Sequence, residues 1–362
     1  MDWIIRCHAG SGWPYTAVWI NGLRITLWRL RRYKGMGLID RLSLDVFQST
    51  NLRTGQEDRW VAQPVADGYL LAVLDGHGGA DVADLAASRL AHYFRLGLQQ
   101  KLPENAVSGQ DDRAPTELHL KNNMPGVEVT TTPERSGHGR KHRNTIAADG
   151  YAARIHEALR ATVALLVSDC ARYKHVGTTL SMAYVIPAGD NLKVFTAQLG
   201  DSAILVLTPE GILHATTAHS VMTCQKDRAT ITQALQATQA RDNPSFWHRA
   251  ASLSDQYLMV GPTDEDTLGI AVTRAIGDSC FDGLMVRTPE LQDFTVPRNS
   301  LILGMTDGVH AGGTQAKRDA AFRTIARGIQ TGVSAQEMGD TLIRQTDLVD
   351  NITLASLRLE VH

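Results

Sequence analysis

Asp75-Gly76-His77 is the group of residues in this sequence that points most clearly to a chemical reaction. It follows the apolar run 70–74, which predicts a buried strand, and its glycines predict a tight turn where that strand ends. There the Asp75 carboxylate and the Gly76 carbonyl could ligate a cation together, because glycine lets the backbone approach an ion closely. His77 would stand beside the ion as a proton carrier. Alone the motif is weak, since Asp-Gly is also a very common turn dipeptide.

The same pattern recurs along the chain, which strengthens the first motif. Apolar, β-type runs lead into Asp201 and Asp307, Asp350 directly precedes another such run, and Glu57-Asp58 adds two more acids. Six carboxylates gathered in one place would repel one another unless a multivalent cation neutralised them. Ligands made only of oxygen suit Mg or Mn rather than Zn. The sequence therefore predicts a site for hard divalent cations at the ends of strands.

Taken in order, the motifs resemble those of the metal-dependent serine/threonine protein phosphatases of the 2C type. Each motif is short and nonspecific alone, but their collinear order from about residue 38 to residue 360 is a strong signal. The motifs are Arg53-Thr-Gly-Gln-Glu57-Asp58, Asp75-Gly-His-Gly-Gly79, Gly177-Thr-Thr-Leu180, Leu199-Gly-Asp201-Ser202, Val272-Thr-Arg-Ala-Ile-Gly-Asp278, Arg287-Thr-Pro-Glu290, Thr306-Asp307-Gly308 and Asp350-Asn351-Ile-Thr353.

The resemblance implies a centre of two Mg or Mn ions. Asp75 would bridge the two ions, and the Gly76 carbonyl, Asp307 and Asp350 would complete their direct ligation. Asp201 would help Asp307 to bind a third, weaker ion.

The resemblance also implies the reaction. Glu57 and Asp58 would hold water molecules in the coordination shells of the ions. Arg53 would grip the substrate phosphate, since a planar guanidinium binds a phosphate dianion with two hydrogen bonds. A water activated by the ions would attack phosphorus in line. His77 would protonate the departing serine or threonine alkoxide, a role that suits a group with a pKa near working pH.

Departures from the family pattern lie beside these residues. Ala203 stands where the family usually has arginine, and His310 stands where an aromatic residue is usual. The segment 218–221 lacks the common Asp-His-x-Pro pattern, and 221–262 would form a flap beside the cleft. The departures leave the predicted chemistry intact but leave the substrate preference open.

Helices and strands must bring the motifs together. Strands are expected over 42–47, 176–213, 270–304 and 352–359. The long connection between residues 79 and 177 could indicate α/β winding. The resemblance implies instead an α+β fold, a four-layer α-β-β-α sandwich of two mainly antiparallel sheets flanked by helix pairs, with the dinuclear site at one end. Apolar stripes predict two of the helices, at Val82, Leu85, Ala86, Leu90, Tyr93 and Phe94, and at Ile155, Leu159, Val163 and Leu166.

The motifs of one site span nearly the whole chain, so we expect one catalytic domain over 39–362. A proline-rich, polar stretch over 101–150 predicts a flexible insert. Residues 1–38 form a basic extension with scattered tryptophans. It is either an amphipathic membrane-surface or organelle-targeting segment, with a weak membrane contact through residues 1–35, or a dispensable extension. We favour the second.

Composition excludes several partners. A net charge of −2, with 43% hydrophobic and 20% charged residues, is typical of a globular protein and argues against nucleic-acid binding. Four widely spaced cysteines and the lack of a long apolar run argue against disulfides, a zinc site and an integral membrane segment. We expect a cytoplasmic enzyme.

Three functions remain in order of preference. The first is a phosphatase acting on phosphoserine and phosphothreonine proteins. The second is a metal-dependent hydrolase of another phosphoester on the same scaffold. The third is a catalytically silent binding relative, which the retention of Asp75, Asp307 and Asp350 disfavours.

Overall fold

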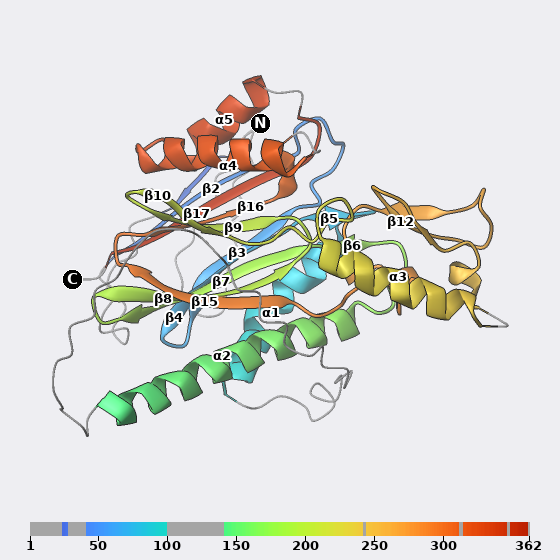
Figure 1. Cartoon of the computed structure of the whole chain (residues 1–362). Coiled ribbons are helices and arrows are strands. Elements are labelled where there is room, and N and C mark those ends of the chain that lie inside the picture. The colour runs from blue at the N-terminus through green and yellow to red at the C-terminus, as the bar shows by residue number, and fades with distance from the viewer. Residues whose placement is uncertain are drawn as a thin grey trace, which may run out of the picture.

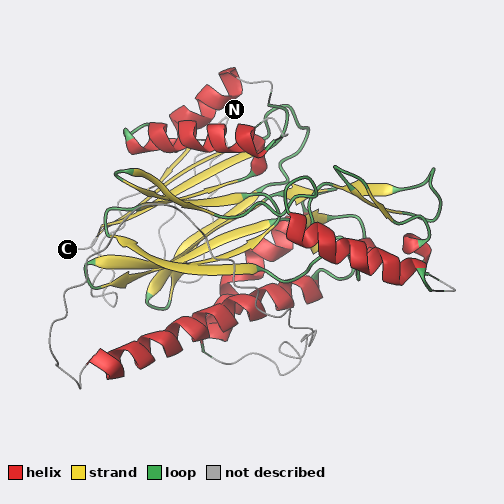
Figure 2. Ribbon diagram, viewed as in Figure 1, coloured by secondary structure: helices red, strands yellow, loops and turns green. Residues whose placement is uncertain are grey.

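The computed structural model describes residues 24–27, 41–99, 141–241, 244–310, 314–345 and 348–360. The rest of the predicted extension and insert lies outside these ranges. The described part is a mixed α/β fold with two large antiparallel sheets and five α-helices (Figures 1 and 2).

The six-stranded sheet is built from strands far apart in the sequence. Its β-branched and leucine-rich strands pair antiparallel throughout, which fits their β-propensity. In spatial order they are β1 (Arg24–Leu27), β2 (Arg41–Ser49), β17 (Ile352–Glu360), β16 (Leu301–Met305), β9 (Ala203–Thr208) and β10 (Gly211–Ala215).

β1 comes from the predicted N-terminal extension. Its residues 24–27 pair with residues 44–47 of β2, so an edge strand precedes the first strand expected from the sequence. Composition gave no strand signal there. Whether the extension is dispensable stays a prediction.

The five-stranded sheet explains why the first motif follows an uninterrupted apolar run. In β4, alternate residues Leu70, Ala72 and Leu74 face the helices, while Leu71 and Val73 face the other sheet. Both faces are covered, so every residue of β4 is buried. The strand order is β15 (Glu290–Pro297), β8 (Asn191–Leu199), β7 (Leu180–Ala188), β4 (Gly68–Leu74) and β3 (Arg59–Val65).

Helix pairs cover the outer faces of the two sheets (Figure 2). α1 (Asp81–Leu98) and α2 (Lys141–Asp169) share a core with the five-stranded sheet, and the two predicted apolar stripes are confirmed as their packed faces. α4 (Gln315–Gln330) and α5 (Ala335–Gln345) share a core with the six-stranded sheet. No helix in the described ranges is both long and apolar enough to cross a bilayer.

The C-terminal end of the predicted insert is a correction. α2 begins at Lys141, so residues 141–150 are helical and not part of a loop. Sequence periodicity missed these turns because the predicted apolar stripe begins only at Ile155, although Tyr151 and Ala152 also pack against the core.

A side lobe extends from one end of the sheets (Figure 1). It contains α3 (Gln225–Gln239), which the sequence did not predict, with β11 (Ser252–Leu253), β12 (Leu258–Val260) and β13 (Leu268–Ile270). A second small sheet joins β5 (Gly76–His77), β6 (Gly177–Thr178) and β14 (Ile276–Gly277) next to the end of β4. Short 3₁₀ helices span Phe246–His248, Ser279–Phe281 and Asp307–Val309.

A buried ion pair fastens α3 to the segment that leads into β14. Asp227 accepts two hydrogen bonds from the Arg274 guanidinium, at 2.7 and 2.8 Å, and a third from the Thr273 hydroxyl at 2.7 Å. Arg274 also holds the pKa of Asp227 below its usual value, although burial opposes this. Removing one partner leaves a buried charge without compensation.

We therefore expect Asp227→Ala to lower the free energy of unfolding by about 3–5 kcal/mol, measured by urea denaturation. Asp264→Ala, an exposed acid in the same lobe, is the matched control and should change stability by less than about 0.5 kcal/mol. Equal effects of the two variants would contradict this role of the ion pair.

Candidate active site

Strand register places the predicted acids at one end of both sheets. In the six-stranded sheet Met305 pairs with Ala203 and with Leu354, so Asp307, Asp201 and Asp350 follow or precede neighbouring strand ends. In the five-stranded sheet Arg59 pairs with Leu74, which sets Asp58 beside Asp75. Segments up to about 300 residues apart therefore meet at one end of the sheets, which a shared site for the six acids requires.

Asp58 is the most deeply buried of the predicted acids. Its Oδ2 atom accepts hydrogen bonds from the hydroxyls of Thr306, at 2.8 Å, and Thr353, at 2.9 Å. Its Oδ1 atom is buried and finds no hydrogen-bond partner among the described residues. Burial raises the pKa of Asp58 to about 7, helped by the charges of Asp307 and Asp350 and opposed by the two hydroxyls. An oxygen in this position is suited to a cation or a water on a cation.

Asp75, Asp201 and Asp307 complete a cluster of like charges. Burial raises the pKa of Asp75 well above its usual value, and the neighbouring carboxylates of Asp307 and Asp58 raise it further. Burial, together with Asp307, raises the pKa of Asp201 to about 7. Carboxylates this close are stabilised by protons or by cations. The donor set, oxygen atoms only, fits Mg or Mn.

These shifts predict how pH affects stability in the absence of metal. The folded pKa values of Asp58 and Asp201 lie above the ordinary unfolded value, so the folded chain binds more protons between about pH 4 and pH 7. Their stabilising contribution is complete below about pH 4 and is lost as the pH rises through about 7. In chelator, the thermal midpoint should fall by several degrees from pH 5 to pH 8.

Asp201→Asn in chelator should reduce that fall, because it removes one of the repelling charges at pH 8. Added Mn should also reduce the fall in the unaltered protein. A thermal midpoint that rises from pH 5 to pH 8 in chelator would contradict the electrostatic account of the cluster.

The loop that carries Arg53 and Glu57 is held by Asn351. The Asn351 amide accepts a hydrogen bond from the Glu57 backbone N–H at 2.7 Å and donates to the carbonyls of Thr50 and Gly55. Gly76 packs against this loop so closely that a Cβ atom would lie 2.5 Å from the Glu57 carbonyl oxygen. Position 76 therefore requires glycine for its close approach.

Arg53 is a partly exposed arginine that pairs with Asp350. Its guanidinium donates to Asp350 Oδ2 at 2.8 Å, and both side chains are about half exposed. The bond with Asp350 raises the pKa of Arg53, and the charges of Glu57 and Asp75 act in the same direction. The other oxygen of Asp350 accepts from the Asn351 backbone N–H. Among the described residues, no three acidic, histidine or cysteine side chains already surround one point as ligands of a single ion.

His77 is oriented by Asp278, a residue of the predicted motif 272–278 for which the sequence alone indicated no role. The His77 Nε2 atom and Asp278 Oδ2 are 2.7 Å apart, and Asp278 is almost fully buried. Burial alone would lower the pKa of His77, but the hydrogen bond and charge of Asp278 outweigh it and raise the pKa. A Cβ atom on Gly177 would lie 1.9 Å from the Asp278 carboxylate, so the contact needs glycine there.

The backbone of Asp278 is unusual. Its φ of 50° lies in the left-handed region, which a residue other than glycine adopts only at a cost. Its N–H donates to the Val176 carbonyl, and its own carbonyl accepts from Arg287. These bonds hold the strained residue under the imidazole.

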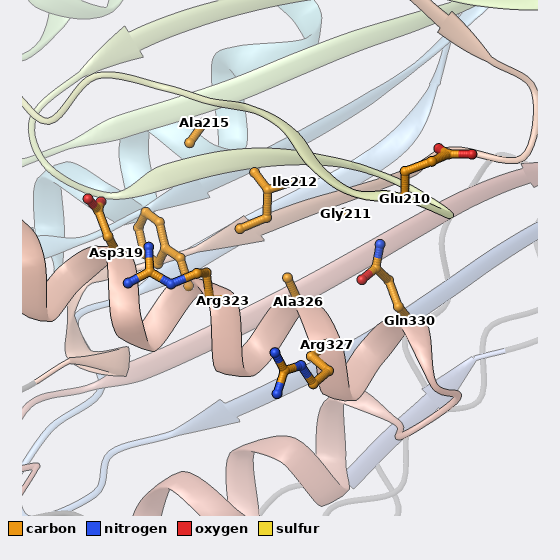
Figure 3. A pocket seen from close by; sticks show the side chains of 10 residues that line it. Glu210, Gly211, Ile212, Ala215, Asp319, Arg323, Ala326, Arg327 and Gln330 are labelled. Atoms are coloured by element: carbon orange, nitrogen blue, oxygen red, sulfur yellow. The ribbon is translucent and has the colours of Figure 1, made fainter.

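A pocket of about 330 Å³ opens beside the carboxylates. Its walls combine the acids Asp201 and Asp307 with the exposed apolar side chains of Met222 and Tyr257, and with Arg318. A larger pocket, of about 520 Å³, lies between the β9–β10 hairpin and α4 (Figure 3). The larger pocket contains none of the predicted site residues, whereas the smaller pocket adjoins the predicted metal ligands Asp201 and Asp307.

Comparison with solved structures shows the fold. A serine-threonine phosphatase 2C from Toxoplasma gondii shares 15% identity over 93% of this chain and 99% of its own, with a TM-score of 0.56. A phosphatase from a pathogenic strain of Toxoplasma gondii shares 14% identity over 89% and 94%, with a TM-score of 0.55. A C. elegans sex determining protein shares 15% identity over 87% of this chain but only 64% of its own, with a TM-score of 0.54.

No match was found among curated proteins. The family model for protein phosphatase 2C matches residues 51–347, which include every predicted site residue except Asp350. A match over so much of the chain, with the fold of solved 2C phosphatases, shows that this protein belongs to the protein phosphatase 2C family.

Proposed function

We propose that the protein is a metal-dependent phosphatase of phosphoserine and phosphothreonine residues in proteins. The observation that carries the proposal is the meeting of Asp58, Asp75, Asp201 and Asp307 from separate strand ends, with raised pKa values at three of them. Membership of the family supports the same activity. Helix pairs on the outer faces support the four-layer α-β-β-α sandwich that the family resemblance implies, with the centre at one end.

The residues that would hold two Mg or Mn ions are Asp75, the Gly76 carbonyl, Asp307 and Asp350. Glu57 and the unpartnered Oδ1 atom of Asp58 would hold water molecules of the centre. When bound, the ions would lower the pKa of a water and stabilise the negative charge that develops on the phosphoryl oxygens.

Arg53 and His77 would act on the substrate itself. The Arg53 guanidinium, held by Asp350 and half exposed, would bind the phosphate and orient phosphorus for in-line attack. His77 would give its proton to the departing alkoxide, and Asp278 would hold the ring in position for that transfer.

We expect Arg53→Ala to raise KM for a phosphothreonine peptide about 10- to 100-fold, because a charged hydrogen bond contributes about 1.5–3 kcal/mol. kcat should change less, since the clamp also acts in ground-state binding. Steady-state kinetics would check this, with Arg160→Ala, an exposed helix arginine, as the control. An unchanged KM would contradict the clamp.

The alternative is a hydrolase of another phosphoester on the same scaffold. The pocket beside the acids favours a peptide, since Met222 and Tyr257 could contact side chains that flank the phosphorylated residue. A side-by-side assay of phosphothreonine peptides and small phosphate monoesters with Mn separates the two. We expect a higher kcat/KM for peptides, and the opposite order would favour the alternative.

A further inference from the structure

Arg318 is a buried arginine at the edge of the carboxylate cluster. It projects from α4 and lines the pocket that also contains Asp201 and Asp307. The side chain is only 6% exposed, and its Nε atom has no hydrogen-bond partner among the described residues. Its Nη2 atom donates two long hydrogen bonds, to the backbone carbonyls of Asp201, at 3.5 Å, and Thr216, at 3.4 Å.

A buried guanidinium needs nearby negative charge, because it cannot give up its proton. Burial lowers the pKa of Arg318, whereas the acids that act on it, Asp201 first and then Asp319 and Asp307, oppose this. The guanidinium is further held over the Phe322 ring, with 4.6 Å between Cζ and the ring centre.

Among the described residues that line this pocket, Arg318 alone carries a permanent positive charge. His310 also lines it, but its imidazole is not a permanent cation. A divalent ion bound by Asp201 on this side would share the pocket with the Arg318 guanidinium, and the two positive charges would repel each other. The family resemblance assigns a third, weaker ion to Asp201 and Asp307, so the two cations would compete for the same carboxylates.

We propose that Arg318 is a built-in cation that takes the place of the third metal ion beside Asp201, so that the centre binds two divalent ions. This inference rests on the proposed metal-dependent function. In the resulting arrangement Asp307 serves the two ions of the centre, while Asp201 balances the charge of Arg318.

The number of bound ions tests the inference without any activity assay. Equilibrium dialysis against Mn, followed by metal analysis, should find two ions per chain in the unaltered protein. Arg318→Met should bind a third, weaker ion, and the double variant Arg318→Met/Asp201→Asn should lose it again. Arg318→Lys, which keeps the charge, should bind two ions. Arg323→Met, an exposed arginine on the same helix, is the matched control and should also bind two.

Three ions in the unaltered protein, with the third lost in Asp201→Asn, would overturn the inference and leave the proposed function standing. A folded Arg318→Met variant that still binds only two ions would also overturn it. If Arg318→Met does not fold, the counts for the unaltered protein and Arg318→Lys decide the matter. No bound Mn in the unaltered protein would contradict the proposed centre itself, and the inference with it.

Discussion

Asp75→Asn is expected to lower kcat/KM for a phosphothreonine peptide by about 10³-fold or more. Asp75 directly follows the buried strand β4, and the charges of Asp307, Asp58 and Asp201 act on it. If it bridges two ions, its loss displaces both. Bound divalent ions generally supply several kcal/mol of transition-state stabilisation, and about 1.4 kcal/mol is a factor of ten in rate.

The loss should come from chemistry and not from unfolding. Asparagine has nearly the shape of aspartate and removes one of the repelling charges, so the thermal midpoint in chelator should be equal or higher. Asp67→Asn, in the exposed β3–β4 turn, is the matched control and should keep full activity. Substantial turnover by folded Asp75→Asn protein would contradict the role of Asp75 as a bridging ligand.

His77→Gln is expected to lower turnover of phosphothreonine peptides by about 10²–10⁴-fold, the range of a general acid. Turnover of an aryl phosphate should fall much less, because a phenolate leaves without protonation. The comparison of the two leaving groups isolates proton transfer from any effect of His77 on metal or phosphate binding.

Asp278→Asn should show the same selectivity in weaker form. Its carboxylate is 2.7 Å from His77 Nε2, and an amide keeps a hydrogen bond but loses the charge that favours the imidazolium. Equal losses on alkyl and aryl substrates in both variants would mean that this pair only organises the site.

The sequence was informative where function and strand ends coincide. Asp75, Asp201 and Asp307 each follow an apolar β-type run, so their place at the end of a strand could be inferred from the local sequence pattern. These strand ends lie together because of the strand register, in which Met305 is opposite both Ala203 and Leu354. Register is set by long-range packing, which a local sequence pattern does not show.

Asp278 and Arg318 show what local pattern does not carry. Asp278 follows Ile276-Gly277, and nothing in this local sequence indicates a role for it. Its role becomes visible only in the structure, where its left-handed backbone conformation accompanies a contact with the His77 ring. Arg318 lies in α4, a helix so polar that its arginines would be expected to be exposed. The helix packs so that Arg318 is nevertheless buried, near acids that lie at the ends of strands. The burial of Asp227 could not be inferred from local pattern either, because its partner Arg274 lies 47 residues away in the sequence.

The most direct test of the proposed function is phosphate release from a phosphothreonine peptide by the purified full chain, with Mn, without metal, and with Mn followed by excess chelator. We expect turnover with Mn or Mg, little turnover without metal, and a loss of turnover on chelation that added Mn restores. Equal phosphate release in all conditions would contradict the claim that these carboxylates work through divalent ions. No release under any condition, by folded protein that binds Mn, would contradict the claim of catalysis on this substrate.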